Sequence, residues 1–128
     1  MKWSLHQLYK YGKETFPFEA VYDFSEEIKR FDDIHNISPA VVVGSGIQIG
    51  EDRFKFDFHI SVMMYLQDAV TLDSVEFPLE LDVVEIFDKE NEDDETRLIE
   101  RNTIDLRGVV WERILLEKPI RVVKGETQ

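Results

Sequence analysis

The sequence predicts an α+β fold that is predominantly antiparallel β, a curved sheet or partial barrel with about two helices. In three stretches, at 16–24, 54–66 and 75–83, every second residue is apolar and most of the residues between are polar or charged. Successive side chains of a strand point to opposite faces, so this period of two indicates strands with one face in a core. Pro78 has no N–H to donate to a ladder, which places the strand at 75–83 at an edge or interrupts it there. Long strands of this kind cover their apolar face by curling or by packing helices against it.

The longest alternation, at 54–66, predicts the central strand of the sheet, because every even position in it is apolar. The stretch 40–49 is rich in Val and Ile, and Gly50, Glu51 and Asp52 separate it from the central strand. This arrangement predicts a β-hairpin. Two glycines inside the first strand of that hairpin, Gly44 and Gly46, indicate a bulge or bend.

Two helices are expected from capping residues and helical spacing. Ser25 can cap a short helix with Glu26 and Glu27 in its first turn. A second helix is expected to begin near Asp105, whose carboxylate can cap its free amides, and to end before Pro119. We expect this second helix to lie over the apolar face of the sheet.

Composition excludes several classes of protein. The 128 residues predict a single domain over 1–128, and 43% hydrophobic and 12% aromatic residues exclude compositional disorder. There is no cysteine, which excludes a disulfide scaffold, a thiolate metal site and a cysteine nucleophile. No apolar run reaches the ~18 residues that span a bilayer, and no secretory leader is visible. We therefore expect a soluble, cytoplasmic protein.

Charge is the first constraint on function. The formal net charge is -12, and positions 73–105 hold 13 acidic residues against Lys89, Arg97 and Arg101. Positions 88–95, inside that region, contain no apolar residue, and their acidic side chains repel one another. This predicts a mobile acidic loop near 88–96. A field of this sign repels phosphate and attracts basic partners. Its plainer interpretation is a solvated surface that keeps the protein in solution.

No catalytic or metal-binding pattern rises above background. The imidazoles His6, His35 and His59 do not have the spacing of a metal motif, and we expect His59 to make an ordinary cross-strand contact. The acidic loop lacks the alternating oxygens and central glycine of an EF-hand. The Gly44–Gly46 stretch matches neither a phosphate-binding loop nor a dinucleotide fingerprint. We expect no enzyme activity, no cofactor and no metal.

Several segments resemble the Gram-positive members of the YceD family. They occur in the family's order and span nearly the whole chain, at Met1–Leu8, Asn36–Val41, Ile104–Leu106 and Ile114–Pro119. Members of that family are described as large ribosomal RNA subunit accumulation proteins. The resemblance implies a role in large-subunit ribosomal RNA accumulation or ribosome assembly, and it implies no defined enzymatic reaction.

One departure from the family pattern concerns a cysteine motif. Many YceD relatives carry Cys-x-Arg-Cys, or a version with one Cys, after the central strand. Here Asp68 and Thr71 stand at the two Cys positions and Val70 at the Arg position. A thiol-metal or redox role therefore does not transfer to this chain.

The leading hypothesis is a non-enzymatic assembly factor that binds a basic ribosomal protein or another basic assembly factor. Complementary charge speeds encounter, and apolar anchors prolong the complex. Trp111, expected to be partly exposed beside Arg107, is the candidate anchor. The candidate partner-binding residues are Glu92, Asp93, Asp94, Glu95 and Trp111.

Two alternatives remain open. One is direct RNA binding through the basic segment before Glu14, where an aromatic ring among cations could stack bases and hold phosphates. Its candidate residues are Lys2, Trp3, His6, Lys10 and Lys13. The competing interpretation of Trp3 is that it closes the edge of the core. The other alternative is a small-molecule carrier with a cavity inside the curved sheet, although phenylalanines at such positions usually fill a close-packed core.

Overall fold

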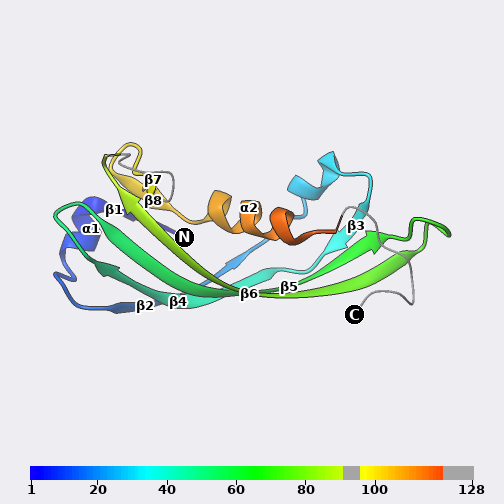
Figure 1. Ribbon diagram of the computed structural model, residues 1–128, viewed down its shortest axis with the longest axis horizontal. Helices are drawn as coiled ribbons and strands as arrows, with labels where there is room; N and C mark the ends of the chain where they lie inside the picture. The colour runs from blue at the N-terminus through cyan, green and yellow to red at the C-terminus, as the bar shows by residue number, and fades with distance from the viewer. Residues whose placement is uncertain (91–95, 120–128) are drawn as a thin grey trace.

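The computed structural model describes residues 1–90 and 96–119. Six strands form one strongly curled sheet, a half-barrel (Figure 1). Its main path runs β2 (Phe16–Tyr22), β4 (Ala40–Gln48), β5 (Phe54–Gln67), β6 (Ser74–Asp88) and β7 (Thr96–Leu98), and β3 (Ile34–Ile37) pairs with β5 beside the end of β4. All pairings are antiparallel except that of β6 with β7, which is parallel.

The remaining elements lie on the concave side of this sheet, as Figure 1 shows. They are the two-stranded ribbon of β1 (Lys2–Ser4) and β8 (Thr103–Asp105), the helices α1 (Leu5–Tyr9) and α2 (Arg107–Glu117), and the 3-10 turn η1 (Glu27–Arg30). Within the described ranges nothing covers the convex side of β2, β4, β5 and β6, which we call the open face. The predicted class, an α+β fold dominated by a curved antiparallel sheet, is confirmed.

The core fills the concave side because the alternation of the strands sends one set of side chains there. Phe54, Phe56 and Phe58 are all buried, as the central alternation predicts. The ring of Phe56 lies 5.0 Å from that of Trp3 and 5.6 Å from that of Phe87, measured between centroids. These rings pack on one another, so the phenylalanines build the core as the close-packed interpretation expects.

The predicted hairpin and the edge position of Pro78 are both confirmed. Strands β4 and β5 pair antiparallel on either side of the 50–52 turn. On β6, the carbonyl of Asp88 accepts from Ile99 N, so this residue's backbone groups point away from β5. Alternate residues of a strand share that direction, which turns the nitrogen of Pro78 to the outer edge, where β6 has no partner strand among the described residues.

The bulge expected from Gly44 and Gly46 is not formed, because β4 keeps an unbroken register with both neighbours. The glycines serve close approach instead. A Cβ on Gly44 would lie 2.2 Å from the carbonyl oxygen of Asp57, and one on Gly46 would lie 2.5 Å from Cζ of Phe16. Both glycines therefore leave room for backbone and ring to come together.

Of the two predicted helices, one is confirmed and the other is wrong. A further helix, α1, was not predicted. Helix α2 begins at Arg107, whose N–H donates to Oδ1 of Asp105, and ends before Pro119. The predicted helix capped by Ser25 is only the 3-10 turn η1, which has no side-chain cap, because the chain is already extended at Phe31 on its way to β3. The unpredicted helix α1 is fixed by a capping box at its start.

The length and hydrophobicity of the helices show whether any of them could cross a membrane. None of the helices in the described ranges is both long and apolar enough to cross a bilayer.

Candidate interaction surfaces

The acidic candidates fall partly outside the described part of the chain. Glu92, Asp93, Asp94 and Glu95 lie within 91–95, so the prediction of a mobile partner-binding loop there stays a prediction. Within 73–105, the exposed carboxylates of β6 are described. Glu76, Glu80 and Asp82 are separated by even numbers of residues along that strand, so all three project on the open face. Part of the acidic character of this region is therefore presented along a described strand.

Trp111 is partly buried, as the sequence indicated. Its ring lies 5.0 Å from that of Phe24 and 6.0 Å, edge to face, from that of Phe31. It lines a pocket of about 550 Å³ between η1 and α2, together with Phe31 and Leu115. An indole held on two rings with part of its surface free is suited to act as a rigid anchor for a partner.

Charged side chains fix the wall beside this pocket. Arg107 lies over the ring of Phe24, with its guanidinium carbon 4.9 Å from the centroid, and donates to Oε2 of Glu27 from Nη2 at 2.7 Å. The other carboxylate oxygen of Glu27, Oε1, is buried and accepts no hydrogen bond from the described residues. Sequence spacing gave no signal for this cluster, because Glu27 and Arg107 lie far apart in the chain.

The N-terminal basic segment is only partly available to a ligand. Trp3 is 5% exposed and packs on core rings, so it cannot stack a nucleic-acid base, and the interpretation of Trp3 as an edge of the core is correct. Lys2 and Lys10 line a pocket of about 490 Å³ with the exposed Tyr11. His6 and Lys13 are exposed but do not line that pocket.

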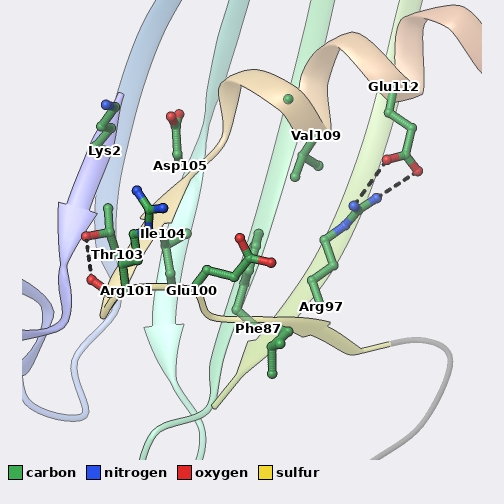
Figure 2. Close-up of a pocket in the computed structure, with 12 residues that line it drawn as sticks. Lys2, Phe87, Arg97, Glu100, Arg101, Thr103, Ile104, Asp105, Val109 and Glu112 are labelled. Carbon is green, nitrogen blue, oxygen red and sulfur yellow. Dashed lines mark hydrogen bonds and ion pairs between the residues drawn. The ribbon is translucent and has the colours of Figure 1, made fainter. Parts of the chain in front are cut away.

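A larger groove of about 940 Å³ lies between the β1–β8 ribbon, β7 and α2 (Figure 2). Arg97, one of the cations that line this groove, is hydrogen-bonded to a carboxylate on each side. Nε donates to Glu85 at 2.7 Å, and Nη1 and Nη2 donate to Glu112 at 3.2 and 3.1 Å. These hydrogen bonds, above all that to Glu85, raise the pKa of Arg97, and the bond from Arg97 lowers the pKa of Glu112.

The far side of this cluster is closed by a second arginine. Glu85 is 4% exposed, and its Oε2 also accepts from Nε of Arg113 at 2.8 Å. A buried carboxylate is stable only when paired and hydrogen-bonded, so two guanidiniums account for Glu85. The arrangement joins β6, β7 and α2. It is a structural cluster with its hydrogen bonds made within the protein.

His59 makes the cross-strand contacts that the sequence predicted. On the open face its Nδ1 lies 2.8 Å from Asp82 and its Nε2 lies 2.7 Å from Glu80. Ser61 donates to the second oxygen of Glu80 at 2.5 Å. Because both ring nitrogens face carboxylates, the doubly protonated imidazole is favoured. The contacts with Glu80, then those with Asp82, raise the pKa of His59.

The two positions at which many YceD proteins carry cysteine, Asp68 and Thr71 in this chain, build the turn between β5 and β6. Asp68 is buried, and its Oδ1 accepts from the backbone N–H groups of Val70 and Thr71 at 2.7 and 2.9 Å. The hydroxyl of Thr71 accepts from Asp73 N at 3.3 Å. In this chain the two side chains therefore act as acceptors for turn amides.

The described residues contain no group of three or more His, Asp or Glu side chains placed to hold a metal ion. The clusters around His59 and Glu85 consist of ion pairs across strands or between elements.

Together these features define a half-barrel protein with one helix-covered face and one open, acidic face. No protein-family model matches the chain, and no solved structure matches it. It is similar to the uncharacterized protein YlbN of Bacillus subtilis (strain 168), with 36% identity over 126 residues that cover 95% of this chain and 73% of YlbN. The chain therefore belongs to the YlbN family.

Proposed function

We propose that this protein is a non-enzymatic, cytoplasmic factor that supports large-subunit ribosomal RNA accumulation or ribosome assembly by binding a basic protein partner. The process is supported by the resemblance of four segments to the YceD family. YlbN is uncharacterized, so the similarity to it does not indicate a biological process. The mechanism is supported by charge, since a chain at -12 with carboxylates exposed along β6 is better matched to a basic protein than to bare RNA.

The partner would be a basic ribosomal protein or a basic assembly factor. Opposite charge accelerates the encounter of two proteins and suppresses nonspecific contacts, whereas buried aromatic anchors slow dissociation. Trp111 is suited to the second task, because two rings hold its indole at the mouth of a pocket between η1 and α2. Exposed carboxylates would thus favour the encounter, and Trp111, on the concave side of the sheet, is one candidate for the lasting contact.

The experiment replaces YlbN in Bacillus subtilis with this chain and measures the ratio of large-subunit to small-subunit ribosomal RNA. Loss of YlbN should lower that ratio, and this chain should restore it. The tagged chain is also recovered from lysate with and without ribonuclease. Basic ribosomal proteins retained after ribonuclease support the proposal. An unchanged RNA ratio in the strain without YlbN contradicts the process, and recovery that ribonuclease abolishes contradicts the mechanism.

Direct RNA binding is the second candidate function. The observation in its favour is that Lys2 and Lys10 line one pocket, and the structure pairs neither of them with a described carboxylate within ion-pair distance. It predicts an RNA affinity that falls with salt and is lost in a Lys2→Ala/Lys10→Ala variant. Trp3 also lines this pocket, but its indole is 5% exposed and packs in the core, so it offers too little surface to stack a base.

A further inference from the structure

We propose that the open face of the sheet is the docking surface for the basic partner, with apolar side chains of that partner covering exposed valines while its lysines and arginines meet a neighbouring row of carboxylates. This inference rests on the basic partner of the proposed function. It adds the location of the interface and the side-chain chemistry that fits it.

The apolar half of the open face is formed by β2 and β4. Val21 lies directly across from Val41, and Val43 is the next outward residue along β4. Their exposed fractions are 61%, 37% and 50%. On an antiparallel sheet the solvent side is ordinarily polar, so three adjoining exposed valines form an apolar patch of the kind that marks an interaction site.

The acidic half lies two strands away, on β6. The sheet register continues from Val41 through Ser61 to Glu80, and from Val43 through His59 to Asp82. Each exposed valine of β4 therefore shares a row with a carboxylate of β6. The row of Val43 also carries Glu19 on β2, and the next row along the sheet carries Asp57 on β5. Lys55 follows in the row after that. Apolar surface beside net negative charge fits a partner with basic residues around an apolar patch.

Both outer edges of this face are unsuited to strand addition, which favours docking on the face itself. The nitrogen of Pro78 points to the free edge of β6. The same alternation, followed through β5 and β4, turns the nitrogen of Pro17 to the outer edge of β2. A proline and charged side chains at an edge are the usual protection against pairing with another strand.

A second copy of this chain is a poor occupant. Two molecules that each carry a net charge of -12 repel, and the carboxylates of Glu80 and Asp82 would lie against an equally acidic surface. A basic protein meets no such opposition. Charge complementarity therefore selects the partner class, and the valines supply the apolar contact area.

His59 makes docking on this surface dependent on pH. It is faced by Asp82 and Glu80 from β6 and by the uncharged Val43 from β4, and Asp57 lies two residues away on its own strand. Protonated His59 already neutralises part of the acidic row. A cationic partner competes with it, so the partner should bind more tightly as pH rises and His59 loses its proton.

The test follows the valine methyl groups of the full chain by NMR. The probe is a synthetic amphipathic helical peptide of leucine and lysine, and the same peptide with glutamate in place of lysine is its control. We expect the methyl signals of Val21, Val41 and Val43 to shift with the lysine peptide only. The indole N–H signal of Trp111 reports the other candidate site.

The outcomes separate this inference from the proposed function. Shifts confined to Trp111 would overturn docking on the open face and leave the basic-partner mechanism standing. Absence of binding at millimolar peptide would count against both. Self-association without peptide, or shifts produced by single-stranded RNA in its place, would overturn the choice of a basic protein as the occupant.

Matched variants test the two halves of the surface. Glu80→Gln/Asp82→Asn should weaken peptide binding about tenfold, since each lost charge contact is worth roughly 0.7 kcal/mol and 1.4 kcal/mol is tenfold. The control Glu14→Gln/Glu117→Gln makes the same change in net charge away from the face and should change the affinity by less than about twofold. Val21→Thr/Val43→Thr, which keeps the side-chain shape, should weaken binding about fivefold. Equal effects of the two charge variants would refute a specific surface.

The pH readout is independent of these variants. Between pH 6 and 8 the affinity of the chain for the lysine peptide should rise, and in His59→Gln this rise should be absent. A purely structural role of His59 would change stability without changing the pH dependence of binding. An unchanged pH dependence in the variant would therefore contradict the competition between His59 and the partner.

Discussion

The buried carboxylate of Glu85 offers a direct test of how the sheet and α2 are joined. Replacing Glu85 by glutamine preserves the shape of the side chain and removes the charge that two guanidiniums surround. Arg97 donates to it at 2.7 and 3.2 Å, and Arg113 at 2.8 Å. The change leaves two cations facing a neutral amide that can accept only part of their hydrogen bonds.

The expected loss of stability follows from burial on both sides of the pair. Breaking a fully buried ion pair costs about 3–5 kcal/mol. Here the carboxylate is 4% exposed, but the side chains of Arg97 and Arg113 are 29% and 38% exposed, so water reaches the cations in the variant. Arg97 also keeps its partner Glu112. We therefore expect Glu85→Gln to lower the free energy of unfolding by about 2 kcal/mol.

Urea unfolding followed by circular dichroism measures this loss. For a domain of this length 2 kcal/mol corresponds to a fall of roughly 8 °C in Tm. The matched control is Glu112→Gln, which removes the same charge from the same arginine at a side chain that is 51% exposed. It should cost less than about 1 kcal/mol. If Glu85→Gln lost no more than Glu112→Gln, the reasoning from burial would be refuted.

Three further predictions use stability and NMR. Gly44→Ala should lower the free energy of unfolding by about 2 kcal/mol or more, because the new Cβ would meet backbone 2.2 Å away; a variant as stable as the parent would show that β4 and β5 can separate freely. Gly108→Ala, in the first turn of α2 where nothing lies within 4 Å, should raise it by about 0.5 kcal/mol, and a decrease in urea unfolding would contradict this. His59 should titrate by NMR above its reference pKa of 6.5, and Glu80→Gln should lower that value. Because the folded-state pKa is the raised one, the stabilisation from His59 is complete below 6.5 and is lost as pH rises through the folded-state pKa; stability that increased over this window would contradict the contacts.

The sheet could be predicted because a strand that is buried on one side has an apolar residue at every second position of its sequence. In β5 every even residue is apolar, and the structure buries that set without exception. The same period predicted β2 and the middle of β6. Strands β1 and β8 could not be predicted this way. Each has three residues, and they form only because distant segments pair, as Trp3 does with Ile104.

The charge of the candidate surfaces could be predicted from the sequence, but their position on the fold could not. Counting charges located the acidic region, but Glu80 and Asp82 acquire their neighbours only through the register with β5. The outward direction of Val41 and Val43 was obscured because the first half of β4, Ala40–Val43, is an unbroken apolar run that gives no alternation. Their outward direction follows from parity once the hairpin register is known, and the position of Val21 across from Val41 then completes the patch.

The pairing of β1 with β8 has a consequence for the order in which this protein is assembled. The hairpins β4–β5 and β5–β6 join neighbouring segments and can form as soon as each has been synthesised. The ribbon instead joins Lys2 to Asp105, and closing so long a loop is entropically expensive and slow. During translation the first strand therefore emerges long before its partner exists. Trp3 therefore remains exposed to solvent until nearly the whole sheet has formed. We expect the pairing of β1 with β8 to be a late event in folding.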